Sequence, residues 1–173
     1  DGTKNIHISC NDEIDNKDDT ATNADLAYTV DTAPPVRSNG QPSTLVITSS
    51  TALSLTTNEQ ATCRYSTTSG ISYDSMVSTT TALGTSHSWS ITGLIDGIKY
   101  YYLRCKDVAN NKNNNDFTII FTVNIPEICD NLADDDGNTL IDCVDPDCTA
   151  IGTGPNGGLC CSTSNQCIPA EKC

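Results

Sequence analysis

Basic residues are scarce in this sequence. Nine Lys and Arg stand against 22 Asp and Glu among 173 residues, which gives a formal net charge of −13 at pH 7. Phosphate backbones and anionic lipid surfaces repel such a chain. The composition therefore argues against nucleic acid as a partner, and it favours divalent cations where the carboxylates converge.

Long apolar runs and catalytic motifs are also missing. No stretch approaches the roughly 18–20 apolar residues of a membrane span, and no basic segment followed by an apolar one opens the chain as a signal peptide would. We therefore expect no membrane insertion, and either a processed mature protein or a fragment. There is no Gly-x-Ser-x-Gly elbow, phosphate loop or His-Glu-x-x-His helix, and both histidines, His7 and His87, are expected at strand surfaces or edges. An enzyme is not expected.

Cysteine, by contrast, is abundant, with ten residues of which seven follow Glu127. A reducing cytosol would not keep so many bridges, so the sequence predicts a secreted or cell-surface protein. Cys63 and Cys105 lie on two expected strands, where a bridge across a sandwich and two buried thiols would both fit. Because the tail holds an odd number of cysteines, we expect Cys10 or one tail cysteine to bond outside the chain, or to stay a thiol in a truncated product.

The C-terminal region is rich in cysteine and aspartate and poor in apolar residues, so bridges and metal must hold it together. Disulfides are preferred to zinc there, because the cysteines lack a paired Cys-x-x-Cys knuckle and a nearby histidine. The cysteines expected in bridges are Cys129, Cys143, Cys148, Cys160, Cys161, Cys167 and Cys173.

Short apolar alternations separated by Gly, Asn and Asp predict many short strands joined by turns, and no segment sustains helical periodicity. The inner face of the last strand is expected to carry Phe117, Ile119, Phe121 and Val123, with Ile120 on the opposite face. The expected strands are Thr44–Leu55, Ala61–Ser66, Ser86–Ile91, Lys99–Lys106 and Asp116–Val123.

A tight-turn motif lies within Ser90–Asn111, where Leu94, Gly97 and Tyr100 are closely spaced. With about 90 residues around it, the motif resembles fibronectin type III and related bacterial immunoglobulin-like modules. The resemblance implies an all-β sandwich in which the Tyr100 hydroxyl bonds back to the turn backbone and pins the corner between the sheets. Asp96 stands where the family usually has a turn proline.

The chain also contains half of an internal repeat. Residues 1–30 read as the last two strands of a second module whose earlier strands are absent, and a lone hairpin is at best marginally stable in water. Either the chain is cut from a tandem array, or the hairpin completes a module of a neighbouring molecule by strand addition. Seven residues recur 95 positions later: Asp1, Gly2, Lys4, Cys10, Asp12, Asn16 and Lys17 match Asp96, Gly97, Lys99, Cys105, Asp107, Asn111 and Lys112.

Proline-containing segments mark the ends of the main module. Ala33–Val36 (APPV) is a stiff entry, and Asn124–Cys129 (NIPEIC) is the exit. We therefore expect two strands of a preceding or partner module at 1–30, a sandwich at 31–126, and a small calcium- and disulfide-stapled region at 127–173.

The strongest chemical signal is the segment Asp134–Asp145, DDDGNTLIDCVD. Oxygen-bearing side chains stand at positions one, three, five, nine and twelve, as in an EF-hand-type calcium loop, and position seven offers its backbone carbonyl. Position six, normally glycine, is Thr139, so Gly137 is expected to absorb the turn. The expected ligands are Asp134, Asp136, Asn138, Leu140, Asp142 and Asp145, with Asp130 and Asp147 as further candidates.

The region Cys129–Cys148 resembles thrombospondin type 3 repeats and the short Cys- and Asp-rich calcium stalks of surface proteins. This resemblance implies a structural calcium ion; a solvated acidic loop is the alternative.

Together these features predict a non-enzymatic structural module of an extracellular stalk or filament. Its partners would be other copies of itself or neighbouring modules of a larger surface protein. The alternative is an adhesin or a carbohydrate-binding accessory domain of a secreted protein, in which Trp89 or Tyr101 would stack on a glycan. Core packing is the competing role for both aromatic residues.

Overall fold

The computed structural model describes residues 1–14, 16–17, 24–76, 78, 80–128, 132–141 and 145–148. Within these ranges the chain is all-β and contains no α-helix, which confirms the predicted class. The described residues include two short 3-10 helices, η1 (Tyr73–Ser75) and η3 (Pro146–Cys148). The strands are β1 (Gly2–Ile8), β2 (Ala24–Val30), β3 (Arg37–Gln41), β4 (Ser50–Ser66), β5 (Gly84–Thr92), β6 (Gly97–Asp107) and β7 (Phe117–Val123).

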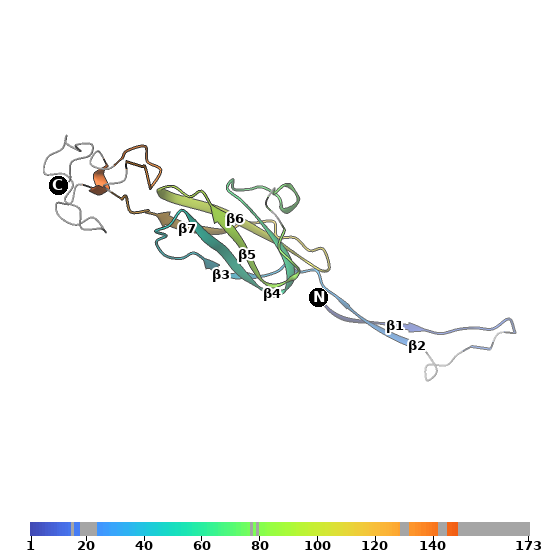
Figure 1. Cartoon of the computed structure of the whole chain (residues 1–173). Coiled ribbons are helices and arrows are strands. Elements are labelled where there is room, and N and C mark those ends of the chain that lie inside the picture. Colours follow the sequence, from blue (N-terminus) through green and yellow to red (C-terminus); the bar gives the residue numbers. More distant parts are fainter. Residues whose placement is uncertain are drawn as a thin grey trace, which may run out of the picture.

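β4 is the central strand of a five-stranded antiparallel sheet (Figure 1). Thr56 has partners in both β3 and β5, whereas Ala61 has partners in both β5 and β6. β5 therefore lines one edge of β4, while β3 and β6 share the other edge in succession. β7 pairs with β6, and a parallel bridge between Val46 and Val123 joins β7 to the segment before β4, so the sheet curls around one core.

Two strand predictions are corrected by the structure. β4 runs unbroken from Ser50 to Ser66, whereas two separate strands, Thr44–Leu55 and Ala61–Ser66, were expected; residues 44–49 lie outside β4. The gap between them is closed because β4 stays extended through residues 57–60, where its pairing with β5 shifts register between Thr56 and Ala61, as at a β-bulge. β3 was not expected, because its sequence RSNGQ is polar; it becomes a strand by pairing with β4.

The core contains alternate residues of the strands that surround it. β7 buries the face predicted for FTIIFTV, and Ile120 on the opposite face is 54 % exposed. Trp89 is buried, as is Tyr101. The Tyr65 ring lies between these two, with ring centroids 5.5 Å apart in both pairs, in the edge-to-face arrangement that aromatic rings favour.

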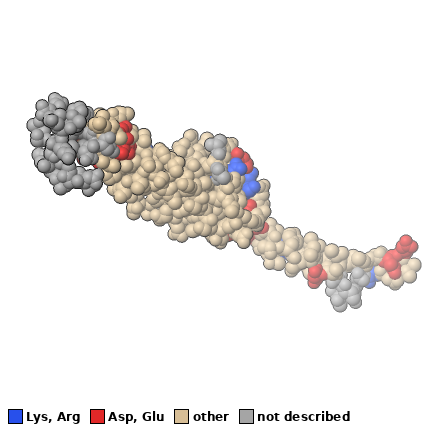
Figure 2. Space-filling view, in the orientation of Figure 1, with Lys and Arg blue, Asp and Glu red and all other residues tan. Residues whose placement is uncertain are grey.

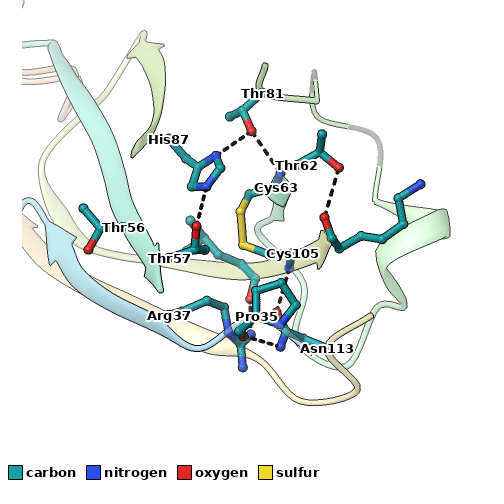
Figure 3. The surroundings of a disulfide bond; sticks show 12 residues. Pro35, Arg37, Thr56, Thr57, Thr62, Cys63, Thr81, His87, Cys105 and Asn113 are labelled. Carbon is teal, nitrogen blue, oxygen red and sulfur yellow. Dashed lines mark hydrogen bonds between the residues drawn. A yellow bond between two sulfur atoms is a disulfide. The ribbon is translucent and has the colours of Figure 1, made fainter. Parts of the chain in front are cut away.

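A disulfide joins Cys63 on β4 to Cys105 on β6, so the expected bridge is present, but not in the expected place. The two cysteines are direct cross-strand partners with Cα atoms 4.0 Å apart, and the bridge links neighbouring strands of one sheet rather than two layers. Their backbone N–H groups donate to side chains outside the strand pair and not to each other. The Cys63 N–H donates to Thr81 Oγ1, and the Cys105 N–H donates to Asn113 Oδ1 (Figure 3). This is the non-hydrogen-bonded type of antiparallel pair, in which the Cα atoms lie closest.

The turn between β5 and β6 is held differently from the tyrosine corner that the family resemblance implies. Leu94 is buried, but Tyr100 is 46 % exposed, and its hydroxyl makes no hydrogen bond within the part of the chain described. Instead Asp96 Oδ1 accepts a hydrogen bond from the Ile125 N–H at 2.7 Å, which ties the turn to the chain leaving β7.

β1 and β2 form a separate two-stranded sheet that projects from the end of the molecule opposite the 132–141 loop (Figure 1). Every residue of the two strands is exposed except Val30, which is half-buried. Hydrogen bonds from Thr32 and Asn111 hold the base of the hairpin. Asp1 Oδ1 accepts a hydrogen bond from the Thr32 N–H at 2.7 Å, and Asn111 Nδ2 donates to the Asp31 carbonyl at 3.1 Å.

Removal of the bridge tests how much it stabilises the sheet. The double variant Cys63→Ala/Cys105→Ala is expected to lower the free energy of unfolding by about 2–4 kcal/mol. Without the bridge, the unfolded chain regains the conformational entropy that the closed loop had removed. Urea unfolding followed by tryptophan fluorescence measures the change. Cys10→Ala is the control and should leave the midpoint unchanged, since Cys10 is exposed and lies outside the curled sheet. Equal midpoints for the double variant and the parent chain would contradict a stabilising role.

Candidate functional site

Three buried carboxylates meet where the chain leaves the curled sheet. Oxygens of Glu127, Asp136 and Asp145 lie within 4.8 Å of one another. The three residues are only 4 %, 1 % and 0 % exposed. Acidic side chains gather at this end of the molecule (Figure 2). Buried charges of one sign are costly unless a counter-charge is present.

A second group shares Asp136 with the first. Oxygens of Asp96, Asp136 and Asp147 also lie within 4.8 Å of one another. Asp96 belongs to the β5–β6 turn, and its N–H donates to the Asp136 carbonyl at 3.3 Å. Residues 132–141, called the acidic loop below, are therefore attached to the curled sheet through Asp96.

Short side chains fold this loop by hydrogen-bonding its own backbone. Asp134 accepts hydrogen bonds from the N–H groups of Gly137 and Thr139, and Asn138 Oδ1 accepts one from Leu140. Asn and Asp commonly close turns in this way. Gly137 takes up the turn as expected, with a φ of 82°, and Thr139 at position six also has a positive φ, 75°. A β-branched residue is strained in that region, and the Asp134 contact helps to hold it there.

The electrostatics of the loop favour a cation. Burial and the neighbouring charges of Asp145, Asp96 and Asp134 raise the pKa of Asp136. Asn138 Nδ2 donates to Asp136 Oδ2 at 2.9 Å and to Asp145 Oδ2 at 2.6 Å, so a partial positive charge already lies between these two carboxylates. A hard divalent ion would supply the full counter-charge and takes oxygen ligands of this kind.

The predicted calcium ligands are only partly brought together. Asp136 and Asp145 lie in the buried group, and Asn138 bonds to both. Asp134 instead uses its oxygens for backbone N–H groups, and the Leu140 N–H donates to Asn138. Asp142 and Asp130 lie outside the described residues.

Glu127 was missed, because it stands outside the spaced loop. Its signal in the sequence is an acid between apolar residues in PEI, directly after the core strand β7. It also accepts a hydrogen bond from the Asp135 N–H at 2.9 Å, which joins the exit segment to the loop. Asp147, a further candidate by sequence, lies in the second acidic group.

Cys148 is buried and disulfide-bonded. Cys10 is exposed beyond the end of β1. The other cysteines expected in tail bridges lie outside the described residues, namely Cys129, Cys143, Cys160, Cys161, Cys167 and Cys173.

The two histidines occupy different environments. His7 is exposed on β1, where Nδ1 bonds to Asp25. His87 was expected at a surface or edge, but it is only 1 % exposed on β5, because its side chain falls on the inner face beside the disulfide (Figure 3). Its Nε2 lies 3.1 Å from Thr57 Oγ1, and its Nδ1 lies 2.8 Å from Thr81 Oγ1.

The neighbours of His87 select its neutral form. The Thr57 hydroxyl donates to the Glu59 carbonyl at 2.7 Å, so it accepts a hydrogen bond from His87 Nε2–H. Nδ1 then accepts from the Thr81 hydroxyl. Burial lowers the pKa of His87. A satisfied imidazole buried among threonines stabilises the core and has no contact with solvent for acid or base chemistry.

The two aromatic residues considered for stacking on a glycan, Trp89 and Tyr101, are both buried. Trp89 is 8 % exposed and Tyr101 is 7 % exposed, so neither ring offers a face to a sugar. Both contact Tyr65 in the core.

The comparisons with known proteins give no family assignment. No family model, curated protein or solved structure matches this chain. Among the described residues, no helix has the length and apolar character that a membrane crossing needs.

His87 gives the fold a pH dependence of known sign. Its folded pKa lies below the unfolded value of about 6.5. Above that value both states are neutral and stability is full. As the pH falls from there towards the folded pKa, protons bind the unfolded chain first and stability decreases. Urea unfolding between pH 7.5 and 5 should therefore show a decline that is smaller in His87→Gln. His7→Gln, which removes an exposed histidine, should keep the full decline; equal slopes in all three proteins would refute the assignment.

Proposed function

We propose that this chain is a non-enzymatic structural module of an extracellular stalk or filament. The observation that carries the proposal is the β1–β2 hairpin, which projects from one end of the molecule with apolar side chains in solvent. Ile6, Ile8, Leu26 and Tyr28 are between 44 % and 55 % exposed. A two-stranded sheet without a packed face is at best marginally stable in water, so the hairpin is suited to join a neighbour.

The cross-strand pairs place these side chains on one face of the hairpin. Ile6 stands opposite Leu26, and Lys4 stands opposite Tyr28. The intervening positions, such as the His7 and Asp25 pair, form the polar face. An amphipathic hairpin of this kind has the pattern of strands that pack on a core.

The curled sheet behind the hairpin supports the sandwich interpretation. Its antiparallel strands alternate buried and exposed residues, and the parallel Val46–Val123 bridge closes its edge. An immunoglobulin- or fibronectin type III-like module of this size serves as a rigid spacer in many extracellular chains. The Cys63–Cys105 bridge fits an oxidising compartment.

Calcium is the cation that we propose for the acidic loop. The donors are carboxylate oxygens, with no histidine among the clustered side chains, and such hard donors suit calcium better than zinc. Glu127, Asp136 and Asp145 would hold the ion, which would neutralise buried charge and fix the loop against the β5–β6 turn. The role is structural and no reaction is assigned to it.

Calcium binding is tested by thermal and urea unfolding with calcium or with a chelator. At 10 mM calcium and a dissociation constant of about 10⁻⁴–10⁻³ M, the folded state should gain about 1.4–2.7 kcal/mol. Asp136→Asn and Asp145→Asn should lose most of this gain. Glu13→Gln removes the same charge from an exposed position and should keep it. No calcium effect in the parent chain would leave the solvated-loop alternative.

The structural role is tested on the source organism. Antibodies against the module should label intact, unpermeabilised cells, and gold particles in electron micrographs should follow filaments or stalks at regular spacing. Labelling that requires permeabilisation, or recovery of the protein only as dispersed monomer, would contradict the proposal. Surface labelling is expected because disulfides form in an oxidising compartment. Regular spacing is expected because the modules would assemble end to end.

A further inference from the structure

We infer that the β1–β2 hairpin is the closing pair of strands of a second module, and that its partner is a β-sheet fragment of the same kind as residues 33–95 of this chain. This inference rests on the proposed structural role and names what covers the hairpin. It is argued from the close correspondence between the hairpin and β6–β7.

The two hairpins have the same register. Gly2 pairs with Val30 at the start of β1, and Gly97 pairs with Val123 at the start of β6. Both glycines have the left-handed φ that other residues rarely adopt, 116° and 109°. The strand pairs therefore begin from the same backbone geometry.

The ends of the two hairpins match as well. Asp12 and Asp107 each exchange three hydrogen bonds with the residue four positions on, Asn16 and Asn111. The side-chain bonds are 2.9 and 2.8 Å in the first case and both 2.8 Å in the second. Isolated bridges close both bends one residue outside these pairs, Asn11 with Lys17 and Lys106 with Lys112.

The bases of the two hairpins match in the same way. Asp1 Oδ1 accepts the N–H of Thr32, two residues after Val30, at 2.7 Å. Asp96 Oδ1 accepts the N–H of Ile125, two residues after Val123, also at 2.7 Å. Start, bend and base thus repeat together, which seven scattered identities in the sequence could not establish.

Only the environment of the apolar face differs. By register, Ile6, Ile8, Leu26 and Tyr28 occupy the positions of Tyr101, Leu103, Ile119 and Phe121. The second set is between 0 % and 7 % exposed, whereas the first set is between 44 % and 55 % exposed. The β1–β2 hairpin therefore has an apolar face like the one that β6 and β7 bury, but none of the described residues covers it.

The surroundings of β6–β7 define the missing partner. The edge of β6 pairs with β4 from Ala61 to Ser66, and its inner face packs in one core with Leu53, Trp89 and Ile91. All of these residues belong to β4 and β5. A second complete copy cannot offer them, because its own β6 already occupies that edge of β4.

Net charge also favours this fragment over a second hairpin as the partner. Residues 1–30 contain two basic and seven acidic side chains, a net of −5, so two hairpins packed on each other would repel. Residues 33–95 contain two basic and two acidic side chains, a net of zero. A segment with that composition accepts the acidic hairpin without this repulsion.

Cys10 adds a chemical signature. It occupies the repeat position of Cys105, which bonds to Cys63 on β4. The partner fragment would bring a thiol at the Cys63 position next to Cys10. With oxidised glutathione as the oxidant, the two thiols lose two protons and two electrons to form one disulfide, and the glutathione disulfide is reduced to two thiols.

The test is a fusion that supplies the fragment. A copy of residues 33–95 is placed directly before Asp1, as Ile95 directly precedes Asp96 in the native chain. Hydrogen exchange of the β1 and β2 amides should slow by about 100-fold or more relative to the unfused chain. Non-reducing peptide mapping after refolding with oxidised glutathione should find Cys10 bonded to the copied Cys63.

The control fusion carries Ile6→Asp and Leu26→Asp, which place charges on the apolar face, and should lose both effects. Fast exchange of β1 and β2 in a folded fusion would overturn the inference. So would concentration-dependent dimerisation of the unfused chain that protects these amides, because it would make a second copy the occupant.

A second variant decides the case if the fusion does not fold. In it, residues 1–32 replace residues 96–125, so that the β1–β2 hairpin must complete the sheet of β3–β5. A folded protein with a Cys10–Cys63 bridge supports the inference, and an unfolded one overturns it. Both experiments use purified protein, so they are independent of the surface labelling that tests the proposed function.

Discussion

The pairing of the second half of β4 with β6 is the constraint on which the rest of the structure depends. It joins residues 61–66 to a strand some 40 positions later and places the Cys63–Cys105 bridge between direct cross-strand partners. Once β6 is fixed, β7 follows by antiparallel pairing, and the inner faces of both strands complete the core. A partly buried ion pair between Arg104 and Asp116, at 2.7 Å, closes the loop between them. Loop-closure entropy opposes such long-range pairing, and the disulfide offsets part of that cost.

The β1–β2 hairpin displays the same local structure without that constraint. Its register, bend and base reproduce those of β6–β7, yet its side chains remain in solvent. Local hydrogen bonds, such as those between Asp12 and Asn16, are therefore enough to shape the hairpin. They do not bury apolar surface, which is the main source of stability in folding. The shape of a hairpin and its stability thus have separate physical origins in this protein.

The acidic loop depends on the curled sheet in a different way. Asp96, in the β5–β6 turn, lies beside Asp136, and Glu127 extends from the end of β7 into the buried group. The sheet thereby collects carboxylates from segments that are distant in sequence, and burial makes their mutual repulsion costly. A bound cation would convert that cost into a connection between the sheet and the C-terminal region. The disulfide and the core would then stabilise the curled sheet, and the ion would stabilise the acidic loop beside it.

The sequence by itself determined the features that rest on local pattern: the all-β class, the inner face of β7, the paired cysteines and the repeat. It also found Asp136 and Asp145 from their spacing, because alternation and loop spacing act over a few residues. Only the tertiary structure decided that β4 is one continuous strand, that His87 is buried between threonines and that Glu127 joins the acidic group. Each of these depends on which distant segment lies alongside, and no local pattern specifies that partner.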